Sequence, residues 1–167
     1  VFAMALAMVM LVCCFASCGG DKGGNDTYFI GATGPLTGDA ADYGIAVNNG
    51  AKLAIEEINA AGGLNGVLFS YEMKDDKATA ADAQTGYNAL IDAGMQISIG
   101  SVTSDSCEAF ATESVKDNLF FITPSASAAN VIADRPNAFR VCFGDPDQGV
   151  LAAQDLAANF EKIGVIY

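Results

Sequence analysis

The chain has 167 residues, 51% of them apolar, which is enough for one packed domain, or for one domain and part of another. Its 20 acidic residues outnumber eight Lys and Arg, and this charge of −12 with scattered cations excludes a nucleic-acid partner, because phosphate recognition needs clustered positive charge. The sequence has no His, which excludes Ser-His-Asp and Cys-His nucleophile pairs and metal sites built on imidazole.

The first element is an apolar segment without charge, VFAMALAMVMLVCCF, which is shorter than the roughly 20 apolar residues of a membrane-spanning helix. It predicts the core of a signal peptide. The following residues, Phe15-Ala16-Ser17-Cys18, resemble the bacterial lipobox, although Phe15 stands where Leu is usual. We therefore expect residues 1–18 to be a lipoprotein signal peptide and Cys18 to be lipidated. An ordinary signal peptide or an N-terminal anchor is the alternative, and it exports the domain equally well.

Residues 19–27 are mostly Gly and polar side chains, which is typical of a flexible tether. Of the five cysteines, two leave with the signal peptide and Cys18 carries the lipid, so that Cys107 and Cys142 remain in the exported domain. An even number of cysteines outside the cytosol permits a disulfide between these two. Two buried free thiols are the alternative, because the sequence does not give the separation of the two Cα atoms.

From residue 28 onward the hydrophobic period alternates between that of strands and that of helices, and Gly62 and Gly94 mark two helix ends. The predicted strands are residues 28–34, 67–73, 96–100, 119–123, 139–143 and 163–167, and the predicted helices are residues 44–61, 78–93, 104–117 and 148–160. Alternating strands and helices with short connections predict right-handed βαβ units. The fold class is therefore α/β, with a doubly wound, mostly parallel sheet.

The loops beyond the carboxyl ends of the strands are the candidate site, because such sheets bind their ligands there. The loop after the first strand, GPLTG, has neither a P-loop motif nor the glycine spacing of a dinucleotide fingerprint. The loops after the third and fourth strands, residues 101–106 and 124–127, are instead rich in hydroxyl groups. Thr103 or Ser104 falls at the start of a helix, where free N–H groups and the helix dipole attract a carboxylate. These features suit an amino acid that is bound without reaction.

Each candidate residue also has a purely structural interpretation. Ser104 can be a helix cap without any contact to a ligand, and Ser125 and Ser127 can be simple turn residues. Tyr43, at the entrance of the first helix, can be a packing residue.

The adjacent carboxylates Asp75 and Asp76 look like a metal pair, but neighbours in sequence point to different sides. We therefore expect a solvated turn here and no metal site. The sequence shows no nucleophile paired with a base and no cofactor loop. We expect a binding protein without a cofactor rather than an enzyme.

Residues 30–66, IGATGPLTGDAADYGIAVNNGAKLAIEEINAAGGLNG, resemble the opening of the branched-chain amino-acid-type solute-binding proteins of ABC transporters, which have the type I periplasmic-binding fold. The later segments IGSVTS, FITPSAS and FRVCFGDPDQG follow in that family's order and spacing. The resemblance implies two α/β lobes, joined by three crossovers, that close on a ligand. Residues 28–147 then form the N-terminal lobe, and residues 148–167 begin the second lobe.

The resemblance also implies roles for individual residues. Ser104 would hold the ligand carboxylate through its hydroxyl and amide, and Ser125 would offer its backbone carbonyl to the ammonium group. Ser127 would contact the zwitterion through its hydroxyl and amide, and Tyr43 would lie beside the side-chain pocket. Asp105 departs from the family pattern, because it replaces a small neutral residue beside the carboxylate site.

The function implied by the resemblance is that of an extracytoplasmic, lipid-anchored solute-binding component of an ABC importer. It would pass an amino acid or a similar small zwitterion to permease subunits in the membrane. The alternative is the ligand-sensing ectodomain of a receptor with the same fold, which would continue into a membrane helix and a signalling domain.

Overall fold

The computed structural model describes residues 27–166. The expected signal peptide, the lipidated Cys18 and all of the expected tether except its last residue lie outside this range. The strands are β1 (Tyr28–Gly34), β2 (Phe69–Asp75), β3 (Ile97–Ser98), β4 (Phe121–Thr123) and β5 (Ala138–Arg140). The helices are α2 (Ala41–Ala60), α3 (Ala80–Asp92), α4 (Ser104–Lys116) and α5 (Asp145–Asn159), with a short 3-10 helix, η1 (Ala129–Val131).

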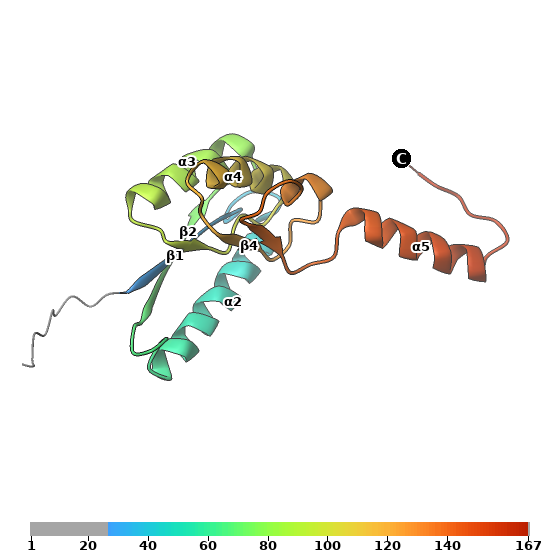
Figure 1. The fold of residues 1–167 in the computed structure, drawn as a ribbon. Helices are drawn as coiled ribbons and strands as arrows, with labels where there is room; N and C mark the ends of the chain where they lie inside the picture. The colour runs from blue at the N-terminus through green and yellow to red at the C-terminus, as the bar shows by residue number, and fades with distance from the viewer. Residues whose placement is uncertain (1–26, 167) are drawn as a thin grey trace, which may run out of the picture.

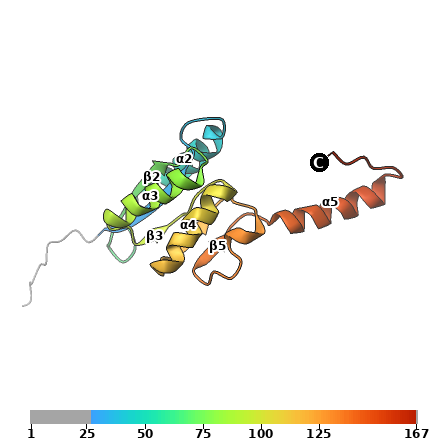
Figure 2. The ribbon, with the colours of Figure 1, turned by 90° about the horizontal axis from the view of Figure 1, so that it is seen from above.

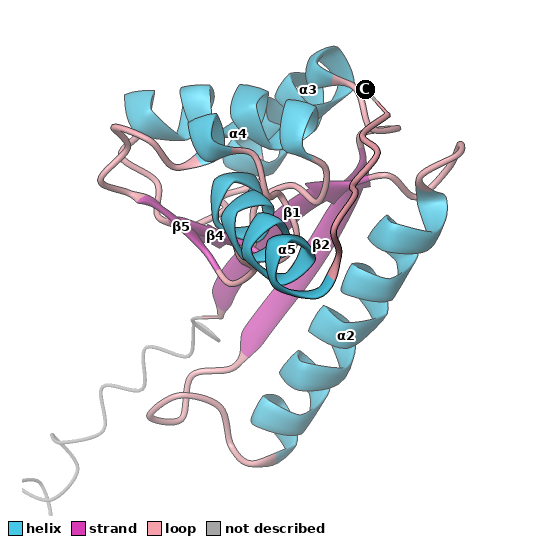
Figure 3. Cartoon of the chain, turned by 90° about the vertical axis from the view of Figure 1, so that its right-hand side faces the viewer, coloured by secondary structure: helices cyan, strands magenta, loops and turns pink. Residues whose placement is uncertain are grey.

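The five strands form one parallel sheet in the order β2-β1-β3-β4-β5. Helices α3 and α4 lie side by side on one face of the sheet, and α2 lies on the other face (Figure 1; Figure 3). The order reverses at β1, which pairs with β2 on one side and with β3 on the other. The predicted α/β class with a doubly wound, parallel sheet is therefore confirmed.

The larger core lies under α3 and α4. Its centre is a row of aromatic rings from α3, α4 and β4: Tyr87 packs edge-on against Phe110 at a centroid distance of 4.8 Å, and Phe110 packs against Phe121 at 5.5 Å. All three side chains are buried. Such contacts add a directional preference to the burial of apolar area, and this core fixes the sheet on which the loops stand.

The face covered by α2 is less completely buried. Ala32, Met73 and Val102 form a small core there, and Gly44 is the buried residue of α2. Beside α2, this face holds an apolar groove of about 460 Å³, whose walls include Val47 of α2 and Ile122 of β4. None of the four residues predicted to bind ligand lines this groove.

Helix α2 begins at Ala41, three residues before the predicted start at residue 44. Gly44 lies near the start of this helix and closely approaches the preceding loop: a Cβ atom on Gly44 would lie 1.9 Å from the carbonyl oxygen of Pro35. The glycine therefore belongs to the helix and allows the loop to pack on it. Helix α5 also begins early, at Asp145, with a proline in its first turn, which is a favourable position for proline.

The sixth predicted strand is wrong for residues 163–166, which form no strand. Helix α5 leads the chain away from the sheet and contains no buried residue (Figure 2). The segment after α5 therefore has no neighbouring strand to pair with, and an apolar run without a partner does not form a sheet. Within residues 27–166, no helix combines the length and the apolar character that crossing a membrane requires.

Candidate ligand-binding site at the carboxyl edge of the sheet

Parallel pairing brings the ends of β1, β2, β3 and β4 to one edge of the sheet. Ser104 is the first residue of α4, and Ser125 and Ser127 lie in the loop after β4. The hydroxyl of Ser104 accepts a hydrogen bond from the amide of Ala128 at 3.3 Å. The start of α4 and the loop after β4 are therefore neighbours, and the three half-buried serines gather at this edge.

The first turn of α4 carries no side-chain cap. Thr103 occupies the N-cap position with extended backbone, but its side chain makes no capping hydrogen bond. Among the residues that the structure describes, the buried hydroxyls of Thr103 and Ser106 have no hydrogen-bond partner. The amides of this turn are thus available to an anion, and the helix dipole favours negative charge at the same place. Asp105, in this turn, is exposed to solvent.

The carbonyl group of Ser127 anchors the loop after β4 to the end of β5 and the start of α5. This oxygen accepts hydrogen bonds from Nη1 of Arg140 at 2.8 Å and from the amide of Asp145 at 3.0 Å. Within residues 27–166, the amide and hydroxyl of Ser127 and the carbonyl of Ser125 make no hydrogen bond. These free groups are the ones that the resemblance assigns to a ligand.

Sequence reasoning missed Arg140. The residue stands at the end of β5, and its guanidinium also binds the carbonyl oxygen of Ala128 at 3.0 Å. A cation that ends a short edge strand was the only signal in the sequence, and it does not reveal which carbonyl groups it binds. Arg140 supports the site because its planar donors hold two successive carbonyl groups of the loop.

Tyr43 lies on the first turn of α2 and is 66% exposed. It makes no hydrogen bond to the three serines. Its expected place beside a side-chain pocket therefore stays a prediction.

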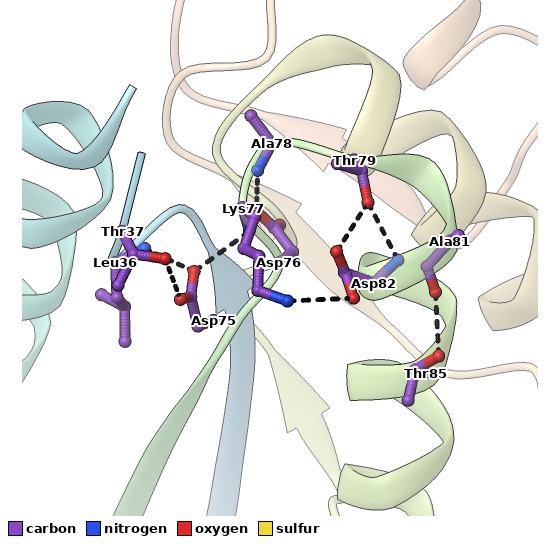
Figure 4. A network of polar contacts seen from close by, with 10 residues as sticks. All are labelled: Leu36, Thr37, Asp75, Asp76, Lys77, Ala78, Thr79, Ala81, Asp82 and Thr85. Carbon is purple, nitrogen blue, oxygen red and sulfur yellow. Dashed lines mark hydrogen bonds and ion pairs between the residues drawn. The ribbon is translucent and has the colours of Figure 1, made fainter. Parts of the chain in front are cut away.

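Asp75 fixes the GPLTG loop (Figure 4). Its carboxylate accepts hydrogen bonds from the amide of Leu36 at 2.8 Å, the hydroxyl of Thr37 at 2.5 Å and the amide of Lys77 at 3.0 Å. Partial desolvation acts to raise the pKa of Asp75, but the hydrogen bonds from Thr37, Leu36 and Lys77 together hold this pKa below its ordinary value.

Asp76 points away from Asp75, as expected of sequence neighbours, but the expected solvated turn is wrong for it. Its side chain is fully buried, and it accepts hydrogen bonds from the hydroxyl of Ser101 at 2.6 Å and the amide of Ala78 at 2.9 Å. Burial raises the pKa of Asp76, although the bonds from Ser101 and Ala78 oppose this effect. The two carboxylates thus hold different loops, and in residues 27–166 no group of three or more candidate ligands gathers around a metal position.

Cys107 and Cys142 are free thiols in the structure, so the disulfide that the sequence permits is not formed. Cys107 is buried on α4, and burial raises its pKa to about 11. The thiol of Cys142 is half-buried and donates to the carbonyl oxygen of Ala126 at 3.6 Å.

Comparison with known proteins decides the family. A family model described as periplasmic binding protein matches residues 27–167. The chain belongs to the periplasmic binding protein family. Solved family members share the fold over the part that aligns, and a type 1 periplasmic binding protein from Bordetella pertussis superposes with a TM-score of 0.75 at 27% identity, covering 81% of this chain and 39% of that one. The predicted type I periplasmic-binding fold is confirmed.

Two curated relatives of this periplasmic binding protein carry names that state a ligand. The Leu/Ile/Val-binding protein BraC3 of Rhizobium johnstonii is 32% identical over 133 residues, which are 79% of this chain and 36% of the relative. The leucine-, isoleucine-, valine-, threonine- and alanine-binding protein of Pseudomonas aeruginosa is 34% identical over 138 residues, 81% of this chain and 37% of the relative. The chain therefore spans little more than a third of the length of these relatives.

A solved structure with a bound ligand is also similar. The branched-chain amino acid transporter substrate-binding protein LivJ from Streptococcus pneumoniae, in complex with isoleucine, has a TM-score of 0.75 and 30% identity. The match covers 80% of this chain and 38% of LivJ.

Proposed function

We propose that the full-length protein is the extracytoplasmic solute-binding component of an ABC importer and that it binds an amino acid at the carboxyl edge of this sheet. The observation that carries the proposal is the set of free polar groups around the contact between Ser104 and Ala128. Free amides and hydroxyls of α4 and of Ser127 lie at the same edge of the sheet as the free carbonyl of Ser125. Donors and an acceptor are thus available for the two ends of a zwitterion.

The chemistry of each group fits one end of an amino acid. The hydroxyl oxygen of Ser104 is used as an acceptor by Ala128, which leaves its proton to donate to a carboxylate. The amide and hydroxyl of Ser127 and the first-turn amides of α4 add donors for the same anion. The carbonyl of Ser125 accepts from an ammonium group. Hydrogen bonds of this kind hold a ligand without forming or breaking a covalent bond, so we infer no enzymatic reaction.

The names of the relatives support an aliphatic amino acid as the ligand. BraC3 is named for leucine, isoleucine and valine, and LivJ is solved with isoleucine. We infer the same class for this protein, and we place Tyr43 beside the ligand side chain.

Transport requires a second lobe and a membrane partner. We assign residues 28–147 to the N-terminal lobe and residues 148–167 to the start of the second lobe. A ligand between the lobes favours closure to the extent that it makes stronger contacts in the closed form, and the closed form then docks on the permease subunits. Lipidation of Cys18, with residues 19–27 as a tether, would keep the protein at the membrane.

A thermal-shift experiment on the full-length mature protein tests the proposal. L-leucine binds the native state, so it is expected to raise the melting temperature; at a hundredfold excess over Kd the stabilisation is about 2.7 kcal/mol. Two matched controls are 4-methylpentanoate, which lacks the ammonium group, and 3-methylbutylamine, which lacks the carboxylate. Both should give a much smaller shift. If neither leucine, isoleucine, valine nor any other amino acid raises the melting temperature, the proposed function is refuted.

A further inference from the structure

A chain of buried hydrogen bonds runs behind the proposed ligand site and begins at Asp76. This residue follows β2, and its side chain has 0% exposure. Its carboxylate accepts hydrogen bonds from the hydroxyl of Ser101 at 2.6 Å and from the amide of Ala78 at 2.9 Å. Its backbone amide donates to the carbonyl oxygen of Gly34 at 3.0 Å. Asp76 is thus bonded to the end of β1, to the entry of α3 and to the loop that leads into α4.

The chain of hydrogen bonds continues from Ser101 to the loop after β4. The carbonyl oxygen of Ser101 accepts from the hydroxyl of Thr123 at 2.7 Å, and the oxygen of that hydroxyl accepts from the amide of Ala126 at 3.2 Å. Ser101 and Thr123 are fully buried. The series Asp76, Ser101, Thr123, Ala126, which we call the Asp76 relay, therefore links the ends of β2, β3 and β4.

The Asp76 relay ends next to the proposed ligand contacts. Ser101 precedes Ser104 by three residues, and Ala126 stands between Ser125 and Ser127. The hydrogen bond from the amide of Ala128 to the hydroxyl of Ser104 also joins these two loops directly. The position of each ligand loop thus depends on a buried partner in another loop.

Asp76 itself is too deeply buried to touch a ligand at the edge of the sheet. A hydrogen bond to an ionised carboxylate is stronger than one between neutral groups, and the low dielectric of a buried site strengthens it further. We propose that Asp76 is a positioning residue, which acts through Ser101 to hold the loops of Ser104 and Ser127 in the geometry that binds the amino acid. The effect on ligand affinity rests on the proposed function; the effect on loop order does not.

The test compares Asp76→Asn with Ser114→Ala in the full-length protein. Asparagine keeps the shape and one acceptor for Ala78, but its amide nitrogen can only donate to the oxygen of Ser101, so a neutral hydrogen bond of reversed direction replaces the stronger bond to a charged carboxylate. Ser114 is the matched control, because its hydroxyl is equally buried near the end of α4. It donates to the carbonyl oxygen of Ala111 in the same helix and accepts from the side-chain amide of Asn137, which directly precedes β5 at the opposite edge of the sheet. Each variant is examined by amide hydrogen exchange and by calorimetric titration with L-leucine.

We expect Asp76→Asn to speed exchange in residues 101–106 and 124–128 and to weaken L-leucine binding, each by about tenfold, the scale of the difference between a hydrogen bond to a charged group and a neutral one. Ser114→Ala should leave the exchange rates of these loops and the affinity for L-leucine within about twofold of the parent. Its melting temperature should nevertheless fall by about as much as that of Asp76→Asn. If Asp76→Asn does not fold, Ser101→Ala replaces it, because this variant removes the hydroxyl and keeps the carbonyl that Thr123 uses.

Unchanged exchange in both loops would overturn the positioning role, whatever the affinity. An equal loss of affinity in Ser114→Ala would also overturn it, since the effect would then reflect general stability. Absence of L-leucine binding by the parent would count against the proposed ligand, while the exchange measurement would still decide the role of the Asp76 relay.

Discussion

The hydroxyl of Ser104 and the amide of Ala128 are joined by a hydrogen bond of 3.3 Å, although the two residues are 24 positions apart. This bond uses the oxygen of Ser104 and leaves its proton free. It also sets the distance between the first turn of α4 and the loop that carries Ser125 and Ser127. The proposed ligand contacts therefore belong to one geometry and not to independent caps and turns.

The replacement of Asp75 by Asn is expected to loosen the GPLTG loop, because the carboxylate holds Leu36, Thr37 and Lys77. The folded-state pKa of Asp75 lies below its ordinary value of 3.8, so its contribution to stability is fully present above pH 3.8 and is lost as the pH falls through the lower, folded-state pKa. Urea unfolding of parent and variant should show a gap in unfolding free energy above pH 3.8 that narrows as the pH falls below this value. Asp39→Asn, an exposed change in the same loop, is the control. A gap that widened on acidification would be inconsistent with this sign.

Gly44→Ala should destabilise the protein, because the added Cβ would lie 1.9 Å from the carbonyl oxygen of Pro35. Relief of this clash by backbone movement costs about 1–3 kcal/mol. Gly50→Ala is the matched control on the same helix, since a Cβ there meets no atom within 4 Å, and it should stabilise the helix by about 0.5–1 kcal/mol. Denaturant unfolding measures both. Equal effects of the two changes would contradict the close packing of the loop on α2.

The two domain cysteines should differ in reactivity. The thiolate is the reactive form, and Cys107 is buried with its pKa raised to about 11, whereas Cys142 is half-buried. Brief treatment of the native protein with iodoacetamide should modify Cys142 first, and Cys107 should react once the protein is unfolded without a reductant. Peptide mapping by mass spectrometry reads out both sites. A disulfide-linked pair of peptides would show that the free-thiol arrangement is wrong.

The order of strands and helices was predictable because it depends on local periodicity. A strand that faces the core on one or both sides and a helix with one apolar stripe leave different patterns in the sequence. This was sufficient for the five strands, the four helices and the parallel sheet. It failed at the start of the first helix, which was predicted at Gly44, whereas α2 begins at Ala41 and Gly44 packs within the helix against Pro35. It failed again at residues 163–166, where an apolar run has no partner strand.

The site was predictable only in part. The rule that ligands bind beyond the carboxyl ends of parallel strands pointed to the hydroxyl-rich loops after the third and fourth strands, and the family resemblance assigned roles to Ser104, Ser125 and Ser127 within them. The difference between Asp75 and Asp76 was not predictable, because it arises from pairing: Gly34 and Asp75 end β1 and β2 in register, and the next residue turns into the core. The partners of Arg140 likewise depend on how two distant loops meet.

Calorimetric titration of the full-length protein with L-leucine, in parent, Ser104→Ala and Thr112→Ala forms, tests the assignment of the site most directly. Thr112 is the control because it carries an exposed hydroxyl on the same helix, bonded to Glu108. The parent should bind at one site, Thr112→Ala should bind as tightly, and Ser104→Ala should bind about tenfold to a hundredfold more weakly, as expected for a lost hydrogen bond to a charged group. Equal affinity of folded Ser104→Ala and parent would show that the amino acid is not held at this edge of the sheet.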